Sequence, residues 1–180
     1  MPCVQTLINP STLVFNVKKL KDFQIEPILL ENSVVIPTNQ ISMINNNEEE
    51  NMFVLLLEFL KDLPLSVNAK LTFTTGYFNP PDHLINKFAQ IKDNVKITFI
   101  TAAPKASSFY KASGFRSIIP CLYRLALLKW VKALNKKSNI NFLEYNLTGR
   151  TYHSKGLWLE INYTDKTEYL TVYGSSNYAL

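Results

Sequence analysis

The sequence predicts an α/β fold in which a mixed β-sheet is flanked by helices. Strand-like and helix-like segments alternate from residue 48 onward, and the last two strand-like segments are joined by a short turn. In addition, 47% of the 180 residues are hydrophobic. Alternation favours a parallel sheet covered by helices, and a hairpin adds antiparallel strands to it. The apolar content is sufficient for a sizeable core and excludes a wholly disordered chain.

The individual elements follow from local composition. Residues 48–62 are predicted to form a helix buried between other elements, because apolar side chains surround most of it. Segments rich in β-branched and aromatic residues are predicted strands, and Pro80 suits the first turn of a helix. The other predicted elements are strand 69–75, helix 80–92, strand 95–101, loop 103–115, helix 117–137, strand 140–145, strand 151–161 and strand 168–173.

The chain is predicted to divide at residue 45. Residues 1–45 are interpreted as a connecting N-terminal segment with strand-like composition at 12–17 and 33–36, and residues 46–180 as the domain that carries the chemistry. No secretory signal and no clear transit peptide is visible in the first 20 residues. No apolar run reaches the roughly 18 residues that a membrane span requires.

The charge balance predicts an anionic partner. Lys and Arg number 19 against 14 Asp and Glu, which gives a net charge of +5. A nucleotide, a phosphate ester, a nucleic acid and an anionic lipid surface all fit this charge. Cys3 and Cys121 are too few and too far apart for a disulfide scaffold or a zinc site.

The most informative motif is the His-x-Lys at His153 and Lys155. Residues two apart in a strand project from the same face, so these two side chains are expected to lie together. Lys can hold a phosphate oxygen, while His can attack phosphorus or move protons. For any His-x-Lys alone, an exposed His beside a solvated Lys is the favoured alternative.

A second motif follows one hairpin later, at Gly174-Ser175-Ser176-Asn177. Pairing of strands 151–161 and 168–173 would place this turn next to His153 and Lys155. Glycine permits close approach of the backbone to a ligand, and the turn and its polar side chains can donate to phosphate oxygens. The two motifs together predict a phosphate site.

A third candidate is Lys105, which follows a strand at the end where α/β sheets usually bind ligands. With Lys111 and Arg116 it is predicted to bind substrate phosphates. The alternative is a solvated basic loop.

The two motifs, His-x-Lys and then Gly-Ser-x-Asn, resemble the active site of the phospholipase D superfamily. Longer matches narrow the resemblance to eukaryotic phosphatidylglycerophosphate synthases over residues 50–180. The matching segments, in the family's order, are 75–79, 101–106, 109–111, 119–120, 151–158 and 174–177.

This resemblance implies a phospholipase D-like fold and a reaction. A phosphatidyl group passes from CDP-diacylglycerol to glycerol-3-phosphate through a phosphohistidine, giving phosphatidylglycerophosphate and CMP. His153 would exchange protons and Lys155 would bind a phosphate oxygen. Gly174, Ser175 and Asn177 would add supporting contacts to the same phosphate. The resemblance implies no metal, no cofactor and no nucleic acid. It implies that the protein associates peripherally with the anionic surface of the mitochondrial inner membrane.

The sequence also departs from the family pattern. Ser107 and Ser108 replace an Asn-Gly pair, Arg150 replaces a Trp, and Glu160 stands where the superfamily has Asp. The other histidine, His83, has no Lys two residues on and is interpreted as a surface or capping residue. The chain is therefore predicted to hold the second motif of a two-motif site, to lack the first, and to stop just after Gly-Ser-Ser-Asn.

Two other functions stay open at this point: a single-motif dimeric phosphodiesterase or nuclease, and a truncated, non-catalytic product. Two structural expectations complete the prediction. The apolar side of helix 117–137 is expected to pack on the sheet, with contact to anionic lipid as the alternative; that side holds Ile118, Leu122, Leu125, Leu128 and Val131. Trp158 is expected to lie in the core.

Overall fold

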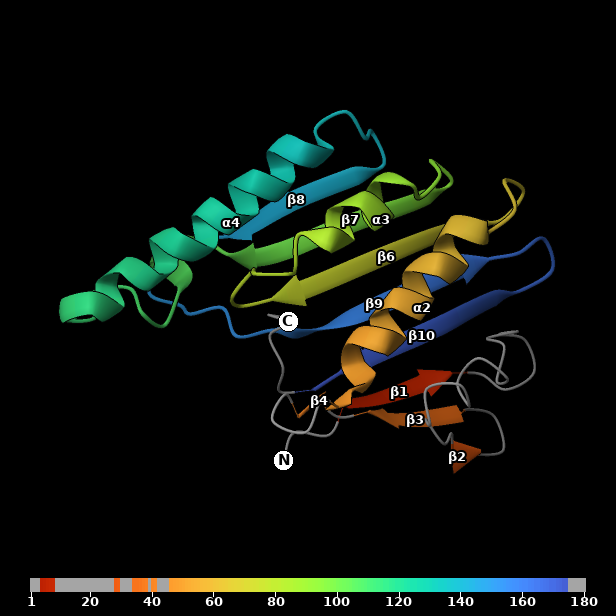
Figure 1. The fold of residues 1–180 in the computed structure, drawn as a ribbon, viewed down its shortest axis with the longest axis horizontal. Coiled ribbons are helices and arrows are strands. Elements are labelled where there is room, and N and C mark those ends of the chain that lie inside the picture. The colour runs from red at the N-terminus through yellow and green to blue at the C-terminus, as the bar shows by residue number, and fades with distance from the viewer. Residues whose placement is uncertain (1–3, 9–27, 30–33, 39, 42–45, 175–180) are drawn as a thin grey trace.

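A computed structural model of the chain describes residues 4–8, 28–29, 34–38, 40–41 and 46–174 (Figure 1). Its main feature is an eight-stranded sheet in the order β2-β3-β1-β10-β9-β6-β7-β8. The strands are β1 (Val4–Ile8), β2 (Ile28–Leu29), β3 (Val34–Thr38), β6 (Asn68–Thr75), β7 (Val95–Ala102), β8 (Ile140–Tyr145), β9 (Lys155–Asn162) and β10 (Thr167–Tyr173). The short strands β4 (Gln40–Ile41) and β5 (Asn46–Asn47) pair separately.

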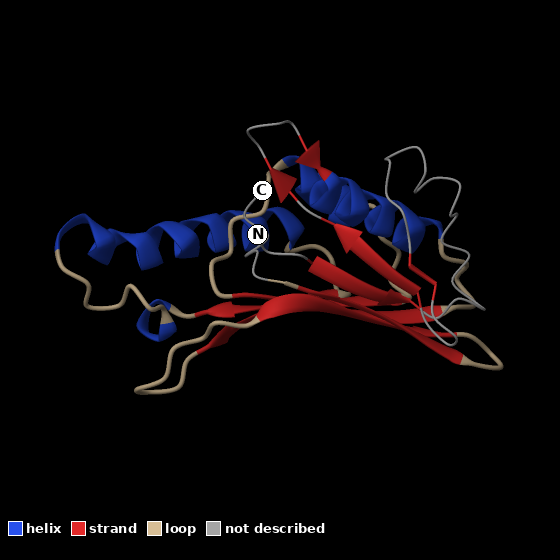
Figure 2. Ribbon diagram, turned by 90° about the horizontal axis from the view of Figure 1, so that it is seen from below, coloured by secondary structure: helices blue, strands red, loops and turns tan. Residues whose placement is uncertain are grey.

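The sheet is mixed, as predicted. Strands β6, β7 and β8 are parallel to one another, β9 is antiparallel to β6, and β10 is antiparallel to β9. The helices are α2 (Glu48–Asp62), α3 (His83–Ala89) and α4 (Ile119–Leu134), with 3-10 turns η2 (Pro104–Ala106) and η3 (Gly114–Ile118). The described helices α2, α3 and α4 all lie on one face of the sheet (Figure 2).

Most element bounds agree with the sequence prediction. Helix α2 and strand β8 have the predicted bounds, while α3 and α4 are shorter than predicted. The predicted start of strand β9 is wrong, because the strand begins at Lys155 and not at residue 151. The N–H of Tyr152 donates to the carbonyl of Ala106 at 2.8 Å, which holds the segment before β9 outside the sheet.

The described part of the N-terminal segment contributes strands to the same sheet. β1 pairs antiparallel with β10 on one side and with β3 on the other. The strand-like composition at 33–36 corresponds to β3, whereas 12–17 lies outside the described residues. The division of the chain at residue 45 stays a prediction.

The core lies between the helices and the sheet, and aromatic rings dominate it. Phe99 on β7 is 1% exposed and stacks on Phe142 with ring centroids 4.9 Å apart. Its ring also meets those of Phe88 at 5.1 Å and Trp130 at 5.9 Å. One side chain therefore connects helices α3 and α4 to strands β7 and β8 of the sheet.

The opposite face of the sheet carries exposed side chains, and this overturns one expectation. Trp158 is 41% exposed and does not lie in the core. Its neighbours Leu157 and Leu159 on β9 are the buried residues, because alternate side chains of a strand point to opposite faces. The predicted core position of Trp158 is wrong by one step of this alternation.

The predicted packing of the 117–137 helix is also wrong. Helix α4 buries Leu127, Trp130 and Leu134, which form a different side of the helix from the predicted one. Four of the five residues predicted to pack on the sheet are exposed: Ile118, Leu122, Leu125 and Leu128. Among the helices that the structure describes, none combines the length and apolar character needed to cross a bilayer.

Candidate active site

The candidate site lies at the edge of the sheet where the parallel strands have their carboxyl ends. Thr75, the last residue of β6, pairs with Lys155, the first residue of β9. Tyr173, the last residue of β10, pairs with Gly156. This register brings the His-x-Lys segment and residue 174 to one edge, in the position where open α/β sheets bind ligands.

His153 and Lys155 lie together although His153 is outside the strand. The Lys155 Nζ atom is 3.4 Å from His153 Nδ1 and 3.4 Å from the His153 carbonyl oxygen. An ammonium group can only donate, so Nδ1 is the acceptor and a neutral His153 ring carries its proton on Nε2. The arrangement leaves an Nε2–H donor on an exposed imidazole beside a positive charge.

The segment that carries these residues is held by neighbouring hydroxyl groups and rings. The Thr74 hydroxyl contacts the Ser154 hydroxyl at 3.0 Å and donates to the Gly156 carbonyl at 3.4 Å. The Tyr77 ring meets the His153 ring edge to face, with centroids 5.9 Å apart. These contacts limit the orientations that the imidazole can adopt.

Of the predicted phosphate-binding turn, the structure describes one residue. Gly174 directly follows Tyr173 and so lies beside the beginning of β9. Ser175 and Asn177 lie outside the described residues, and their placement at the site stays a prediction.

A cationic pocket of about 510 Å³ lies next to His153. Lys105 and Lys111, both predicted from the sequence, line it together with Arg150, and none of its described lining residues is acidic. Within residues 46–174 none of these three cations forms an ion pair with a carboxylate. Unpaired cations around one cavity are suited to an anionic ligand.

The pocket connects to the histidine through two side chains. Ser108 lines the pocket, and its hydroxyl is hydrogen-bonded to the hydroxyl of Tyr77, whose ring contacts His153. The segment around Thr151, which also lines the pocket, leads directly into the His-x-Lys motif.

Arg150 is a site residue that the sequence prediction did not include. The available signal was the replacement of a family Trp by Arg directly after Gly149. Gly149 has φ of 74°, in the left-handed region that favours glycine, and the turn it forms presents Arg150 to the pocket. Because the turn joins β8 to β9, only the fold brings Arg150 next to Lys105.

The other candidates lie elsewhere. Arg116 is in the turn η3 and does not line the cationic pocket. His83 is a surface residue, with its Nε2 atom 3.2 Å from a carboxylate oxygen of Glu50. Hydrogen bonds from Asn162 and from Lys70 lower the pKa of Glu160, which keeps this carboxylate ionised and engaged away from Lys155.

The part of the chain that the structure describes contains no group of three or more His, Cys, Asp and Glu side chains placed to bind a metal ion. The absence of a metal from the chemistry stays a prediction that the resemblance implies.

Comparison with curated proteins identifies relatives of one kind. The chain is 30% identical over 149 residues to a CDP-diacylglycerol–glycerol-3-phosphate 3-phosphatidyltransferase of Schizosaccharomyces pombe, covering 82% of this chain and 29% of that protein. A probable enzyme of the same name from Dictyostelium discoideum is 27% identical, with 82% and 25% covered. The human protein, named as mitochondrial, is 30% identical over 113 residues, with 61% and 20% covered.

The chain thus spans between a fifth and a third of the length of these relatives. No protein-family model matches it. Among solved structures, a phosphatidylserine synthase of Haemophilus influenzae Rd KW20 has a similar fold, with a TM-score of 0.52 at 22% identity over 74% of this chain and 33% of that chain. The similarity to this structure confirms the predicted fold class. The sequence matches confirm the predicted resemblance. Over most of its length, this chain is similar to one segment of the CDP-diacylglycerol–glycerol-3-phosphate 3-phosphatidyltransferases.

Proposed function

We propose that the protein transfers a phosphatidyl group from CDP-diacylglycerol to glycerol-3-phosphate, giving phosphatidylglycerophosphate and CMP. The observation that carries this proposal is the contact of His153 with Lys155 beside the pocket of Lys105, Lys111 and Arg150. A proton carrier next to several unpaired cations suits the transfer of a group between two phosphate esters. The sequence similarity to enzymes named for this reaction supports the choice of substrates.

In the proposed reaction, a histidine from a first motif outside this chain attacks the phosphatidyl phosphorus. The bond from phosphorus to the CMP oxygen breaks, and His153, entering this step as the imidazolium, gives its Nε2 proton to the departing CMP and becomes neutral. A hydroxyl group of glycerol-3-phosphate then attacks the phosphatidyl-histidine, His153 takes up its proton, and the phosphorus–nitrogen bond breaks. Lys155 offsets the negative charge that develops on the phosphorus oxygens in both steps.

The cationic pocket accommodates the phosphate group of each substrate that is not transferred. CDP-diacylglycerol brings the cytidylyl phosphate and glycerol-3-phosphate brings its own monoester. Gly174, Ser175 and Asn177 would add donors on the other side of His153. Relatives named as mitochondrial support a mitochondrial location, and a lipid substrate places the reaction at an anionic membrane surface that the protein contacts peripherally.

The direct test uses radiolabelled CDP-diacylglycerol and glycerol-3-phosphate with the protein expressed together with the coding sequence that flanks this chain. Formation of labelled phosphatidylglycerophosphate and release of CMP are expected. An inert protein would overturn the proposal and favour a non-catalytic product. Hydrolysis of DNA or of a simple phosphodiester, without transfer, would favour the nuclease or phosphodiesterase.

The pocket makes a separate prediction. The variants Lys105→Ala and Arg150→Ala are each expected to raise the KM for a phosphate-bearing substrate about tenfold, because each removes one charge-assisted hydrogen bond. Steady-state kinetics against both substrates would show which phosphate the pocket holds. Lys96→Ala is the matched control, since Lys96 is an exposed lysine at the opposite end of β7. An unchanged KM for both substrates in both pocket variants would contradict the assignment.

A further inference from the structure

Helix α4 and the turn before it expose an apolar stripe that the proposed chemistry does not use. The apolar stripe consists of Phe115, Ile118, Leu122, Leu125 and Leu128. Phe115 is 90% exposed, Leu125 62% and Leu122 57%. Exposed apolar side chains without a binding role are usually scattered singly over a protein surface. Large apolar side chains gathered on one exposed side of a helix therefore mark an interaction surface.

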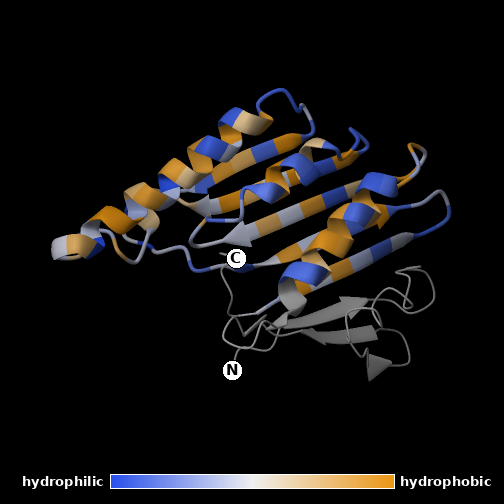
Figure 3. Cartoon of the chain, in the orientation of Figure 1, coloured by the Kyte–Doolittle hydropathy of each residue, from blue (hydrophilic) through white to orange (hydrophobic). Residues whose placement is uncertain are grey.

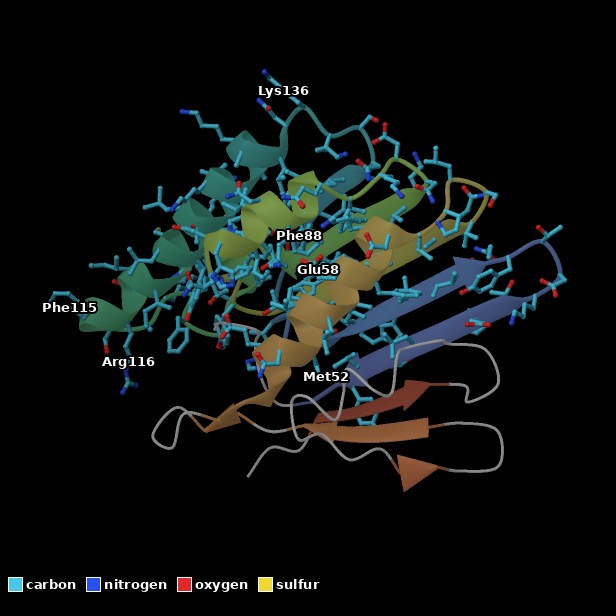
Figure 4. The ribbon with its side chains drawn as sticks, turned by 45° about the vertical axis from the view of Figure 1, so that its right-hand side comes forward. Met52, Glu58, Phe88, Phe115, Arg116 and Lys136 are labelled. Carbon is cyan, nitrogen blue, oxygen red and sulfur yellow. The ribbon has the colours of Figure 1, made fainter. Side chains whose placement is uncertain are left out.

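The charge of this segment points to the partner. Residues 114–134 contain no acidic residue and four cationic ones: Arg116, Arg124, Lys129 and Lys132. Arg124 pairs with Glu144 and Lys129 with Asp82, whereas Arg116 and Lys132 have no carboxylate partner within residues 46–174. Arg116 accompanies Phe115 at the tip of the segment, and Lys136 follows at the other end of the helix (Figure 4). An apolar stripe that contains no acidic residue and is accompanied by the unpaired Arg116 and Lys132 matches the interface of an anionic bilayer.

The same charge argues against a second copy of this chain as the partner. Two copies that met through the apolar stripe would bring together two helix surfaces on which Arg116 and Lys132 have no carboxylate partner within residues 46–174. Like charges placed opposite each other disfavour such an interface.

The position of the stripe relates it to the candidate active site. Strands β6, β7 and β8 all point toward the side of the molecule from which the beginning of α4 projects (Figure 1). The projecting half of the helix is largely apolar in its colouring (Figure 3). A surface on which this half rested would therefore face the same edge of the sheet as His153.

An apolar hollow connects the stripe to the histidine. It has a volume of about 320 Å³ and is lined by Leu122 of the stripe with Asn79, Phe109, Ile119 and Tyr123. The Tyr77 ring lies 5.6 Å from the Phe109 ring, 5.2 Å from the Tyr123 ring and 5.9 Å from the His153 ring, centroid to centroid. The hollow is lined mainly by apolar side chains, whereas the pocket of Lys105 and Arg150 is cationic. Both cavities lie near His153.

We propose that the apolar stripe docks on an anionic bilayer, and that the hollow receives the diacylglycerol end of the lipid substrate while its phosphates lie toward the cationic pocket. The docking surface is inferred from the apolar stripe and the charges beside it. The role of the hollow rests on the proposed function, because it assumes a liponucleotide substrate.

The test measures binding to vesicles and activity separately. Flotation with phosphatidylcholine vesicles, with and without phosphatidylserine, is expected to show binding that is stronger on the anionic vesicles and weaker at high salt. The double variant Leu125→Glu with Leu128→Glu, two stripe residues that do not line the hollow, is expected to bind roughly tenfold or more weakly, because two apolar side chains no longer enter the interface. Leu143→Glu is the matched control, since Leu143 is 53% exposed on the opposite face of the sheet.

The activity measurement compares CDP-diacylglycerol embedded in vesicles with a short-chain, soluble form. The double variant is expected to lose turnover of the embedded substrate and to keep turnover of the soluble one. Wild-type protein that does not bind vesicles, or a double variant that binds as well as wild type, would overturn the docking surface. A change of oligomeric state in the double variant, without a change in vesicle binding, would instead assign the stripe to a protein partner.

Failure of the proposed function gives a different result. Wild-type protein that binds vesicles through the stripe but transfers no phosphatidyl group to glycerol-3-phosphate would leave the docking surface standing and remove the role of the hollow.

Discussion

Replacement of His153 by alanine is expected to lower the rate of phosphatidyl transfer by about 10²–10⁴-fold, the range typical of a lost general acid or base. The physical reason is the position of its Nε2 proton. Lys155 Nζ lies 3.4 Å from Nδ1, so Nε2 is the ring nitrogen left free to give a proton to a leaving group and to take one from the attacking hydroxyl. Quantification of labelled phosphatidylglycerophosphate under saturating substrates would measure the loss, with circular dichroism to establish that the variant is folded.

The chain provides its own control for this experiment. His83→Ala removes the other histidine, which lies on the surface with its ring against Glu50. This variant is expected to keep wild-type turnover, because His83 contacts none of the site residues that the structure describes. Full turnover by His153→Ala, or equal losses in the two variants, would remove His153 from the mechanism.

Replacement of Phe99 by alanine is expected to lower the free energy of unfolding by about 3–5 kcal/mol. The ring is 1% exposed and contacts those of Phe73, Phe78, Phe88, Trp130 and Phe142. Its removal leaves a cavity where the sheet meets α3 and α4, and the surrounding rings relax only partly into such a space. Urea denaturation followed by Trp fluorescence would give the difference.

Phe115→Ala is the matched control for the core, since it removes the same atoms from a side chain that is 90% exposed. Its free energy of unfolding is expected to stay within about 0.5 kcal/mol of wild type. A large loss of stability in Phe115→Ala would show that the projecting tip is packed in the folded protein, and would count against the docking surface. A small loss in Phe99→Ala would contradict the described core.

The order of the elements was predictable because each is encoded locally. The apolar side chains around α2 and the apolar and aromatic residues of β8 predicted the bounds that the structure has. The start of β9 was not predictable, because the hydrogen bond between Tyr152 and Ala106 that keeps residue 152 out of the sheet joins segments 46 positions apart. Strand β1 was missed as well, since its pairing with β10 spans almost the whole chain.

The residues of the candidate site also fall into those that the sequence predicts and those that only the fold brings together. His153 and Lys155 were predictable because their spacing of two is itself the signal, and Lys105 because it follows a strand. Arg150, Ser108 and Tyr77 were not, because they come from three different loops and meet only at the edge of the folded sheet.

The sequence by itself determined the order of strands and helices, the basic character and the pair of residues most suited to phosphate chemistry, because all of these depend on neighbours along the chain. Only the tertiary structure decided which side of each element is buried. Helix α4 has apolar side chains on two sides, and the periodicity of the sequence alone does not show which side packs on the sheet. Packing against Phe88 and Phe99 selected the side of Trp130 and left the side of Leu122 and Leu125 exposed.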